Sequence, residues 1–279
     1  MMRKVALPDA TEVVALGQGT WKIGEGQHPA AAEAASIRRG VELGLTLVDT
    51  AEMYGEGASE RVIAKAIAGI REQVFLVSKV YPHNASQSGV PAACARSLKR
   101  LGTEYLDLYL LHWRGGVPLA ETVAAFERLV AEGKIRRWGV SNFDVDDMEE
   151  LLDVPGGEHC AVNQVLYNPE SRGIEFDLIP FMDRHRIPVM AYSPIGQGGR
   201  LLRAPALVSV AARHGATPAQ VAIAWSLRHP RVIAIPKAGD EAHMRENAAA
   251  ATLTLTAEDL ADIDRAFPPP TRKRSLAML

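Results

Sequence analysis

Four residues of this 279-residue chain carry side chains that could together move a proton: Asp49, Tyr54, Lys79 and His112. A free phenol has a pKa near ~10, too high for ready proton transfer at neutral pH, and a neighbouring ammonium lowers it by favouring the phenolate. A lysine in a protein interior in turn needs a carboxylate such as Asp49. An imidazole beside them could orient a substrate oxygen towards the phenol. The set predicts general acid catalysis on a carbonyl or an alcohol.

Each of these residues also has an ordinary structural role when taken alone. Asp49 could cap a helix, Lys79 could lie on the surface, and His112 could be a core histidine. The sequence offers no nucleophile in this set and no cluster with metal-ligand spacing. A site that protonates a carbonyl without covalent attack needs a source of electrons, and a hydride from a bound nicotinamide is the simplest one.

The elements that must position these residues are strands. Asp49, Lys79 and His112 each end an apolar run that a helical stretch follows. Seven such runs occur, at 45–49, 74–79, 106–112, 137–142, 160–164, 188–193 and 232–237. Continuous apolar runs are typical of parallel strands buried on both faces. The polar or aromatic residues at their ends are Asp49, Lys79, His112, Asn142, Gln164, Tyr192 and Lys237.

A weaker run at 16–21 would be an eighth strand. Eight strand–helix units with right-handed crossovers close into an α/β fold, the (β/α)₈ TIM barrel, and its chemistry lies at the carboxyl ends of the strands. We expect one such domain over residues 1–279. A β-hairpin of strands 4–7 and 11–16 would precede it and close one end, and helices at 206–213 and 256–266 would be additional.

Several local signals place the helices. Residues 30–43 form an alanine-rich helix before Gly44, and Thr217 begins a capping box. Ser59 is expected to cap a helix after a loop that contains Gly55 and Gly57.

The alternative fold is an open, doubly wound sheet that binds a dinucleotide. That fold needs G-x-G-x-x-G after its first strand, with an acidic residue about 20 positions later. Only Gly17-Gln18-Gly19 occurs here, followed by Thr20 and the bulky Trp21. A tryptophan does not suit a backbone that must press against a pyrophosphate, so the barrel is favoured.

Composition excludes several classes of partner. The net charge of −2 gives no electrostatic case for binding nucleic acid or an anionic membrane. Two distant cysteines indicate neither a disulfide framework nor a redox motif, which fits a cytoplasmic protein. No apolar stretch reaches the length of a transmembrane helix. We expect a small-molecule substrate and a monomer, with an oligomer left open.

The motifs resemble those of the aldo-keto reductase family, in the family's order from Gly17 to Asn247. The matching segments are VDTAEMYG (48–55), VSK (77–79), LLHW (110–113), GVSNF (139–143) and IPKA…EN (235–247). Among family members, small prokaryotic reductases of reactive aldehydes such as methylglyoxal are the most similar. The resemblance implies NADPH as the cofactor, with NADH possible.

The resemblance also implies roles for individual residues. Tyr54 would be the general acid, supported by Lys79 and Asp49, with His112 orienting the carbonyl. Trp21 and Trp113 would wall the substrate pocket, together with Tyr54 and His112. The implied cofactor-binding residues are Gly19, Thr20, Trp21, Ser141, Asn142, Gln164, Tyr192, Ser193, Pro194, Gly196, Gln197, Gly198, Lys237, Ala238, His243, Glu246 and Asn247.

One position departs from the family's NADPH-preferring pattern. An arginine usually follows the lysine by six residues, but His243 occupies that place here, and Arg245 would point to the wrong face of a helix. We expect the 2′-phosphate to rest on Lys237, a helix N-terminus after Asp240, and His243. The charge of Asp240 opposes this, so NADH use stays open.

Short loops set the expected substrate class. The segment between Trp113 and Leu119 and the tail after Phe267 are both short, which predicts an open site for small carbonyls such as 2-oxoaldehydes. A cofactor-binding regulatory subunit with little turnover is the alternative function. A phosphate-handling barrel isomerase is disfavoured, because Lys237 and a tyrosine stand where a phosphate loop and a carboxylate base would be needed.

Overall fold

The structure, a computed structural model, describes residues 2–279, and its centre is a ring of eight parallel strands. Their bounds are β3 Gln18–Gly19, β4 Leu47–Asp49, β5 Phe75–Val80, β6 Leu108–Leu111, β7 Trp138–Ser141, β8 Asn163–Leu166, β9 Val189–Tyr192 and β10 Val232–Ile235. The strands follow one another in chain order. Two parallel bridges, Leu16 with Ala234 and Gly19 with Lys237, join the two ends of this order. The expected (β/α)₈ barrel is confirmed.

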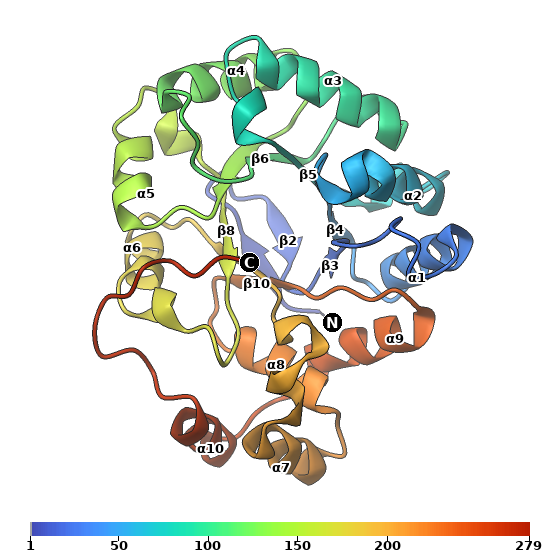
Figure 1. The fold of residues 1–279 in the computed structure, drawn as a ribbon, viewed down its shortest axis with the longest axis vertical. Coiled ribbons are helices and arrows are strands. Elements are labelled where there is room, and N and C mark those ends of the chain that lie inside the picture. The colour runs from blue at the N-terminus through green and yellow to red at the C-terminus, as the bar shows by residue number, and fades with distance from the viewer. Residues whose placement is uncertain (1) are drawn as a thin grey trace.

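Helices surround the ring (Figure 1). Their bounds are α1 Ala30–Glu42, α2 Ala58–Ala66, α3 Gly89–Leu101, α4 Leu119–Ala131, α5 Val145–Leu152, α6 Leu178–Arg184, α7 Pro205–His214, α8 Pro218–Ser226, α9 Glu241–Ala249 and α10 Ala257–Ala266. The two additional helices are α7 and α10, as expected. Thr217 and Thr256 both form capping boxes, which fix the first residues of α8 and α10.

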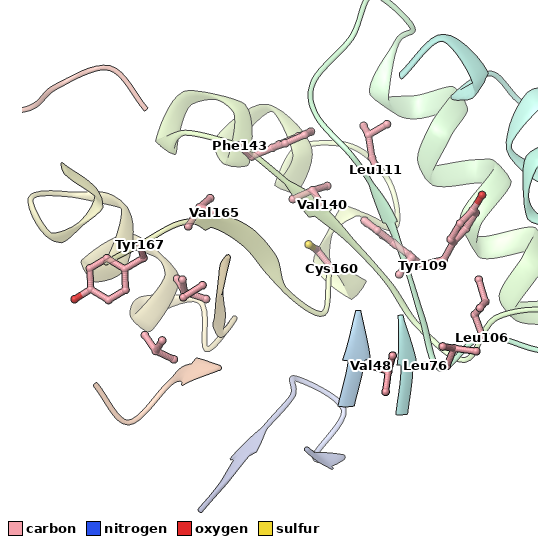
Figure 2. Packing of buried hydrophobic residues seen from close by; sticks show 14 of the residues in the cluster. Val48, Leu76, Leu106, Tyr109, Leu111, Val140, Phe143, Cys160, Val165 and Tyr167 are labelled. Carbon is pink, nitrogen blue, oxygen red and sulfur yellow. The ribbon is translucent and has the colours of Figure 1, made fainter. Parts of the chain in front are cut away.

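Successive residues of each strand face opposite sides of the ring. In β6, Leu108 and Leu110 belong to a cluster inside the barrel, whereas Tyr109 and Leu111 belong to the cluster between strands and helices. Figure 2 shows part of this outer cluster, with Tyr109 and Leu111 labelled. This two-residue period puts Lys79 on the same inner face as Val77.

The hairpin closes the barrel at one end. It consists of β1 Lys4–Ala6 and β2 Glu12–Val14, which pair antiparallel. Val5 and Val13 are buried and pack with the inner cluster of barrel side chains. The hairpin lies behind the centre of the ring in Figure 1. Ligands therefore reach the interior from the opposite end, where the strands end.

No helix within residues 2–279 is both long enough and apolar enough to cross a bilayer. The same residues contain no group of three or more His, Cys, Asp or Glu side chains placed to hold a metal ion.

Candidate active site

Lys79 is fully buried and joins the other members of the predicted set. Its Nζ donates to Asp49 Oδ2 at 2.7 Å, to the carbonyl oxygen of Thr50 at 2.9 Å and to the Tyr54 hydroxyl at 3.2 Å. Asp49 Oδ1 accepts from Gln164 Nε2 at 2.8 Å. All three ammonium protons and both carboxylate oxygens thus have partners, which is what a buried ion pair requires. The structure brings Asp49, Tyr54 and Lys79 together as predicted.

Burial and charge act in opposite directions on these groups. Burial raises the pKa of Asp49, and Lys79 and Gln164 oppose that rise. Burial lowers the pKa of Lys79, but Asp49 and Tyr54 outweigh it, so the pKa of the lysine lies above its usual value and the ammonium persists. Burial raises the pKa of Tyr54 more than Lys79 lowers it. The expected lowering of the phenol pKa is therefore wrong for the net shift, and the phenol stays protonated.

A run of left-handed residues turns Tyr54 back towards Lys79. Gly55, Glu56 and Gly57 have φ values of 55°, 49° and 82°. Glycine adopts this region without strain, which explains two of the three positions. The predicted cap at Ser59 is wrong, because α2 begins at Ala58 after Gly57, without a side-chain hydrogen bond.

Ser59 instead ties this loop to the strand that precedes it. Its buried hydroxyl donates to Thr20 Oγ1 at 2.9 Å, and Thr20 Oγ1 donates to the carbonyl oxygen of Asp49 at 2.8 Å. A serine near the start of a helix can either cap the helix or bond to another side chain, and the sequence does not tell which. Here Ser59 bonds to Thr20.

His112 lies beside the phenol at the floor of the cleft. The rings of Tyr54 and His112 meet edge to face, with centroids 5.8 Å apart. Burial and the nearby Lys79 lower the pKa of His112 to about 2. The imidazole is therefore neutral, and its buried Nδ1 has no hydrogen-bond partner among residues 2–279. A neutral imidazole can donate one hydrogen bond to a substrate oxygen but cannot act as a cationic acid at neutral pH.

These groups open into a cleft of about 810 Å³ at the carboxyl ends of the strands. A cavity of this size is in the upper range for ligand pockets. The predicted residues that line it are Gly19, Thr20, Trp21, Asp49, Tyr54, His112, Trp113, Ser141, Asn142, Gln164, Tyr192, Ser193, Pro194, Gln197, Gly198, Lys237, Ala238, His243, Glu246 and Asn247.

Two predicted residues do not line the cleft. Lys79 lies beneath it and contacts Asp49 and Tyr54, which do line it. Gly196 has a φ of 57° and lies against Leu201, where it turns the loop. Gln197 and Gly198 of the same loop line the cleft, and a cofactor contact of Gly196 stays a prediction.

Polar groups in the middle of the cleft hold one another in place. The Tyr192 hydroxyl donates to Asn142 Oδ1 at 3.0 Å, and Asn142 Nδ2 donates to the carbonyl oxygen of His112 at 3.1 Å. Ser141 Oγ donates to the carbonyl oxygen of Gln164 at 2.8 Å. Asn142 and Ser193 have φ values of 59° and 48°, a conformation that costs energy outside glycine and clusters at functional sites.

The far end of the cleft lies between β10 and α9. Asp240 caps α9 by accepting from the His243 backbone at 2.9 Å, and its other oxygen lies 2.7 Å from His243 Nδ1. The predicted phosphate role of His243 thus competes with a carboxylate already beside it. Asn247 is buried, and its Nδ2 has no partner within residues 2–279. An unpaired buried donor in a cleft fits a ligand that brings an acceptor.

Sequence reasoning missed contributions from loops and from the tail. Gln27 and His28, in the loop before α1, line the cleft near Lys237. Met278 and Leu279, the last two residues of the chain, also line the cleft. Lys273 anchors that tail through Asp177 at 3.1 Å and Asp144 at 3.4 Å. In Figure 1 the tail ends over the centre of the ring. No local pattern marks such long-range contacts.

Known proteins resemble this chain over most of its length. The family model described as "Aldo/keto reductase family" matches residues 15–267. Methylglyoxal reductase YeaE of Escherichia coli (strain K12) is 52% identical over 269 residues, which cover 95% of each protein. Glyoxal reductase of Bacillus subtilis (strain 168) is 35% identical over 260 residues, 93% of this chain and 91% of that protein.

Solved structures of aldo/keto reductases resemble this chain in both sequence and fold. An aldo/keto reductase from Klebsiella pneumoniae, crystallised in complex with NADP and acetate, is 50% identical and superimposes with a TM-score of 0.97 over 100% of both chains. The same values hold for an aldo-keto reductase from that organism in complex with NADPH. The sequence identity, the family match and the shared fold lead to one conclusion: this chain belongs to the aldo/keto reductase family.

Proposed function

We propose that the chain reduces small aldehydes and ketones with NADPH, 2-oxoaldehydes such as methylglyoxal among them, and that Tyr54 donates the proton. The observation that carries the proposal is the position of Lys79 Nζ, which touches both Asp49 Oδ2 and the Tyr54 hydroxyl. The names of the relatives from Escherichia coli and Bacillus subtilis support 2-oxoaldehydes as the substrate class.

The cleft fits a nicotinamide dinucleotide. Asn247 Nδ2, which has no hydrogen-bond partner within residues 2–279, suits an adenine acceptor, and Lys237 lines the cleft where a phosphate would lie. Ser141, Asn142 and Gln164 would hold the carboxamide, and Tyr192 offers an aromatic face to the nicotinamide ring. Gly19, Thr20, Ser193, Pro194 and the loop to Gly198 would contact the diphosphate and riboses. When bound, the nicotinamide supplies the hydride.

The residues of the chain supply orientation and the proton. His112, neutral at working pH, would donate a hydrogen bond to the carbonyl oxygen, and Tyr54 would pass its proton to the same oxygen. Burial raises the pKa of Tyr54 above its usual value, so the phenol carries its proton when the substrate binds. The Lys79 ammonium would stabilise the phenolate left behind, and Asp49 keeps that ammonium charged. Trp21 and Trp113 would confine the substrate.

The test is Tyr54→Phe, with Tyr105→Phe as the matched control. The Tyr105 hydroxyl bonds to Glu72 on the surface, outside the cleft. With methylglyoxal and NADPH, we expect kcat to fall by about 10²–10⁴ in Tyr54→Phe and to stay unchanged in Tyr105→Phe. NADPH binding, followed by quenching of tryptophan fluorescence, should persist in both variants.

Two outcomes would contradict the proposal. Full activity of Tyr54→Phe would remove the phenol from the acid role. A wild-type protein that binds NADPH but turns over no small carbonyl would favour the alternative, a cofactor-binding regulatory subunit.

A further inference from the structure

The loop between β3 and α1 reaches across the cleft to the end that Lys237 occupies. His28 lies against Gly239: a Cβ on that glycine would come within 2.9 Å of His28 Nε2 and 3.1 Å of Lys237 Nζ. The imidazole nitrogen and the ammonium therefore flank the same point. Lys237 Nζ also donates to Gln27 Oε1 at 3.3 Å. His28 Nε2 and Lys237 Nζ thus converge over Gly239, which has no side chain of its own.

The fold holds this loop in place. Ile23 is fully buried, and the backbone N–H of Gly24 donates to the buried Glu33 of α1 at 2.8 Å. Gly24 also packs closely on α2, since a Cβ there would lie 2.9 Å from the Ala58 carbonyl carbon. His28 follows this anchored stretch and immediately precedes Pro29, the residue before α1. His28 is itself exposed, four residues after Gly24 and one before Pro29, so the anchored stretch and α1 bring its loop to the side of Lys237.

Two basic side chains of α9, His243 and Arg245, already have acidic partners. His243 lies 2.7 Å from Asp240, and Arg245 pairs with Glu241 along α9 at 3.4 Å. Within residues 2–279, neither Lys237 nor His28 forms an ion pair with a carboxylate. A dianionic phosphate placed beside Gly239 would find these two groups available.

We propose that His28 is a second ligand of the cofactor's 2′-phosphate, opposite Lys237, and supplies the contact that the residue at 243 does not. This inference rests on the proposed use of NADPH. His28 donates from Nε2 and Lys237 contributes its charge, both to a phosphate that arrives from the cleft they line. Gly239 has no Cβ, which lets the two side chains lie this close to the main chain. Discrimination between NADPH and NADH then depends on a loop whose Gln27 lies 210 residues before Lys237 in the sequence.

The experiment measures binding rather than turnover. The probes are 2′,5′-ADP, which carries the phosphate, and 5′-ADP, which does not, each titrated by calorimetry. The variants are His28→Ala, Lys237→Ala, their double mutant and His28→Arg. His185→Ala is the control, because its ring stacks on Phe181 of α6 and does not line the cleft. Circular dichroism checks that each variant is folded.

We expect His28→Ala to weaken 2′,5′-ADP about tenfold and 5′-ADP less than about twofold. His28→Arg should restore the affinity for 2′,5′-ADP, and the double mutant should lose less than the product of the two single losses, because the two residues share one ligand group. His185→Ala should bind both probes as the wild type does.

Three results would overturn the inference. Unchanged affinity of His28→Ala for 2′,5′-ADP would remove the contact, and equal losses for both probes would move it to another part of the nucleotide. A wild-type protein that binds the two probes equally would overturn the NADPH proposal as well. The first two results leave wild-type discrimination intact, so the two failures are distinguishable.

Discussion

The two ends of the cleft are built in different ways. At the catalytic end, Lys79 is wholly buried and all its protons have partners in Asp49, Thr50 and Tyr54. At the proposed nucleotide end, Lys237 is half-buried, and its one side-chain partner within residues 2–279 is the neutral Gln27. The charge of Lys79 is therefore neutralised within the protein interior, whereas the charge of Lys237 is not paired with a carboxylate of residues 2–279 and is accessible to a ligand.

This difference decides what each end can contribute. A buried charge must be neutralised by the protein itself, since desolvation is costly, so the catalytic end is preorganised before any ligand arrives. A partly exposed charge is solvated and screened, so it affects folding little. Its contribution appears when a ligand displaces water. We expect substitutions at the catalytic end to change stability and kcat, and those at the nucleotide end to change affinity.

The largest contrast should come from one substitution at two positions. Lys79→Met leaves Asp49 charged and buried without its partner, which should lower the free energy of unfolding by about 3–5 kcal/mol. Activity in the remaining folded protein should fall by at least about 10². Lys237→Met should leave unfolding within about 0.5 kcal/mol of the wild type and weaken NADPH selectively. Urea denaturation and steady-state kinetics measure both effects.

If Lys237→Met destabilised the protein as much as Lys79→Met, the division between the two ends would be wrong. The comparison would also fail if Lys79→Met changed only the KM for NADPH.

A second test uses His112, whose pKa burial and Lys79 lower to about 2. The unfolded imidazole titrates near ~6.5, so below that pH the unfolded state binds a proton that the folded state does not. This histidine's contribution to stability is complete above pH ~6.5 and declines on acidification, by up to about 1.4 kcal/mol per pH unit. Urea unfolding of the wild type and His112→Gln at pH 7, 6 and 5 compares the slopes.

The slope with pH should be shallower in His112→Gln. Parallel curves would mean that the folded imidazole takes up a proton in this range, which would contradict a neutral His112 at the catalytic end.

The smallest effect should come from Asn247, at the nucleotide end. Because its Nδ2 has no partner within residues 2–279, Asn247→Ala removes an unsatisfied donor and should change the free energy of unfolding by less than about 1 kcal/mol. Affinities for NADPH and NADH should both fall by about tenfold, since the adenine is common to them. Fluorescence titration with each cofactor measures this. A loss confined to NADPH would place Asn247 at the 2′-phosphate.

The sequence predicted that Asp49, Tyr54 and Lys79 lie together, and the structure places them in contact. Asp49 and Lys79 lie on strands whose inner face is set by a two-residue period, so the barrel topology alone brings them together. The position of Tyr54 was predictable because the glycines Gly55 and Gly57 after it allow the loop to turn back towards Lys79. The direction of its pKa shift did not follow, because it depends on the competition between burial and charge in the assembled site.

The nucleotide end was harder to predict because long-range contacts build it. The motif around Lys237 places that residue, but the approach of His28 depends on how the loop before α1 packs on α2. Similarly, helix-capping preferences could not predict the hydrogen bond from Ser59 to Thr20, because Thr20 is distant in the sequence. Periodicity describes the elements, whereas the loops are fixed by partners distant in sequence.

The ring closes between the segments 15–19 and 234–237. Strand β3 has two residues, and within residues 2–279 three backbone hydrogen bonds join these segments: from Gly17 to Ala234, from Ala234 to Ala15 and from Gly19 to Pro236. Local opening of a protein begins where few such bonds must break. Gly19 and Lys237 stand on the two sides of this seam and both face the cleft. A nucleotide that contacts both residues would oppose separation of the two segments, so that ligand binding would also stabilise the closed barrel.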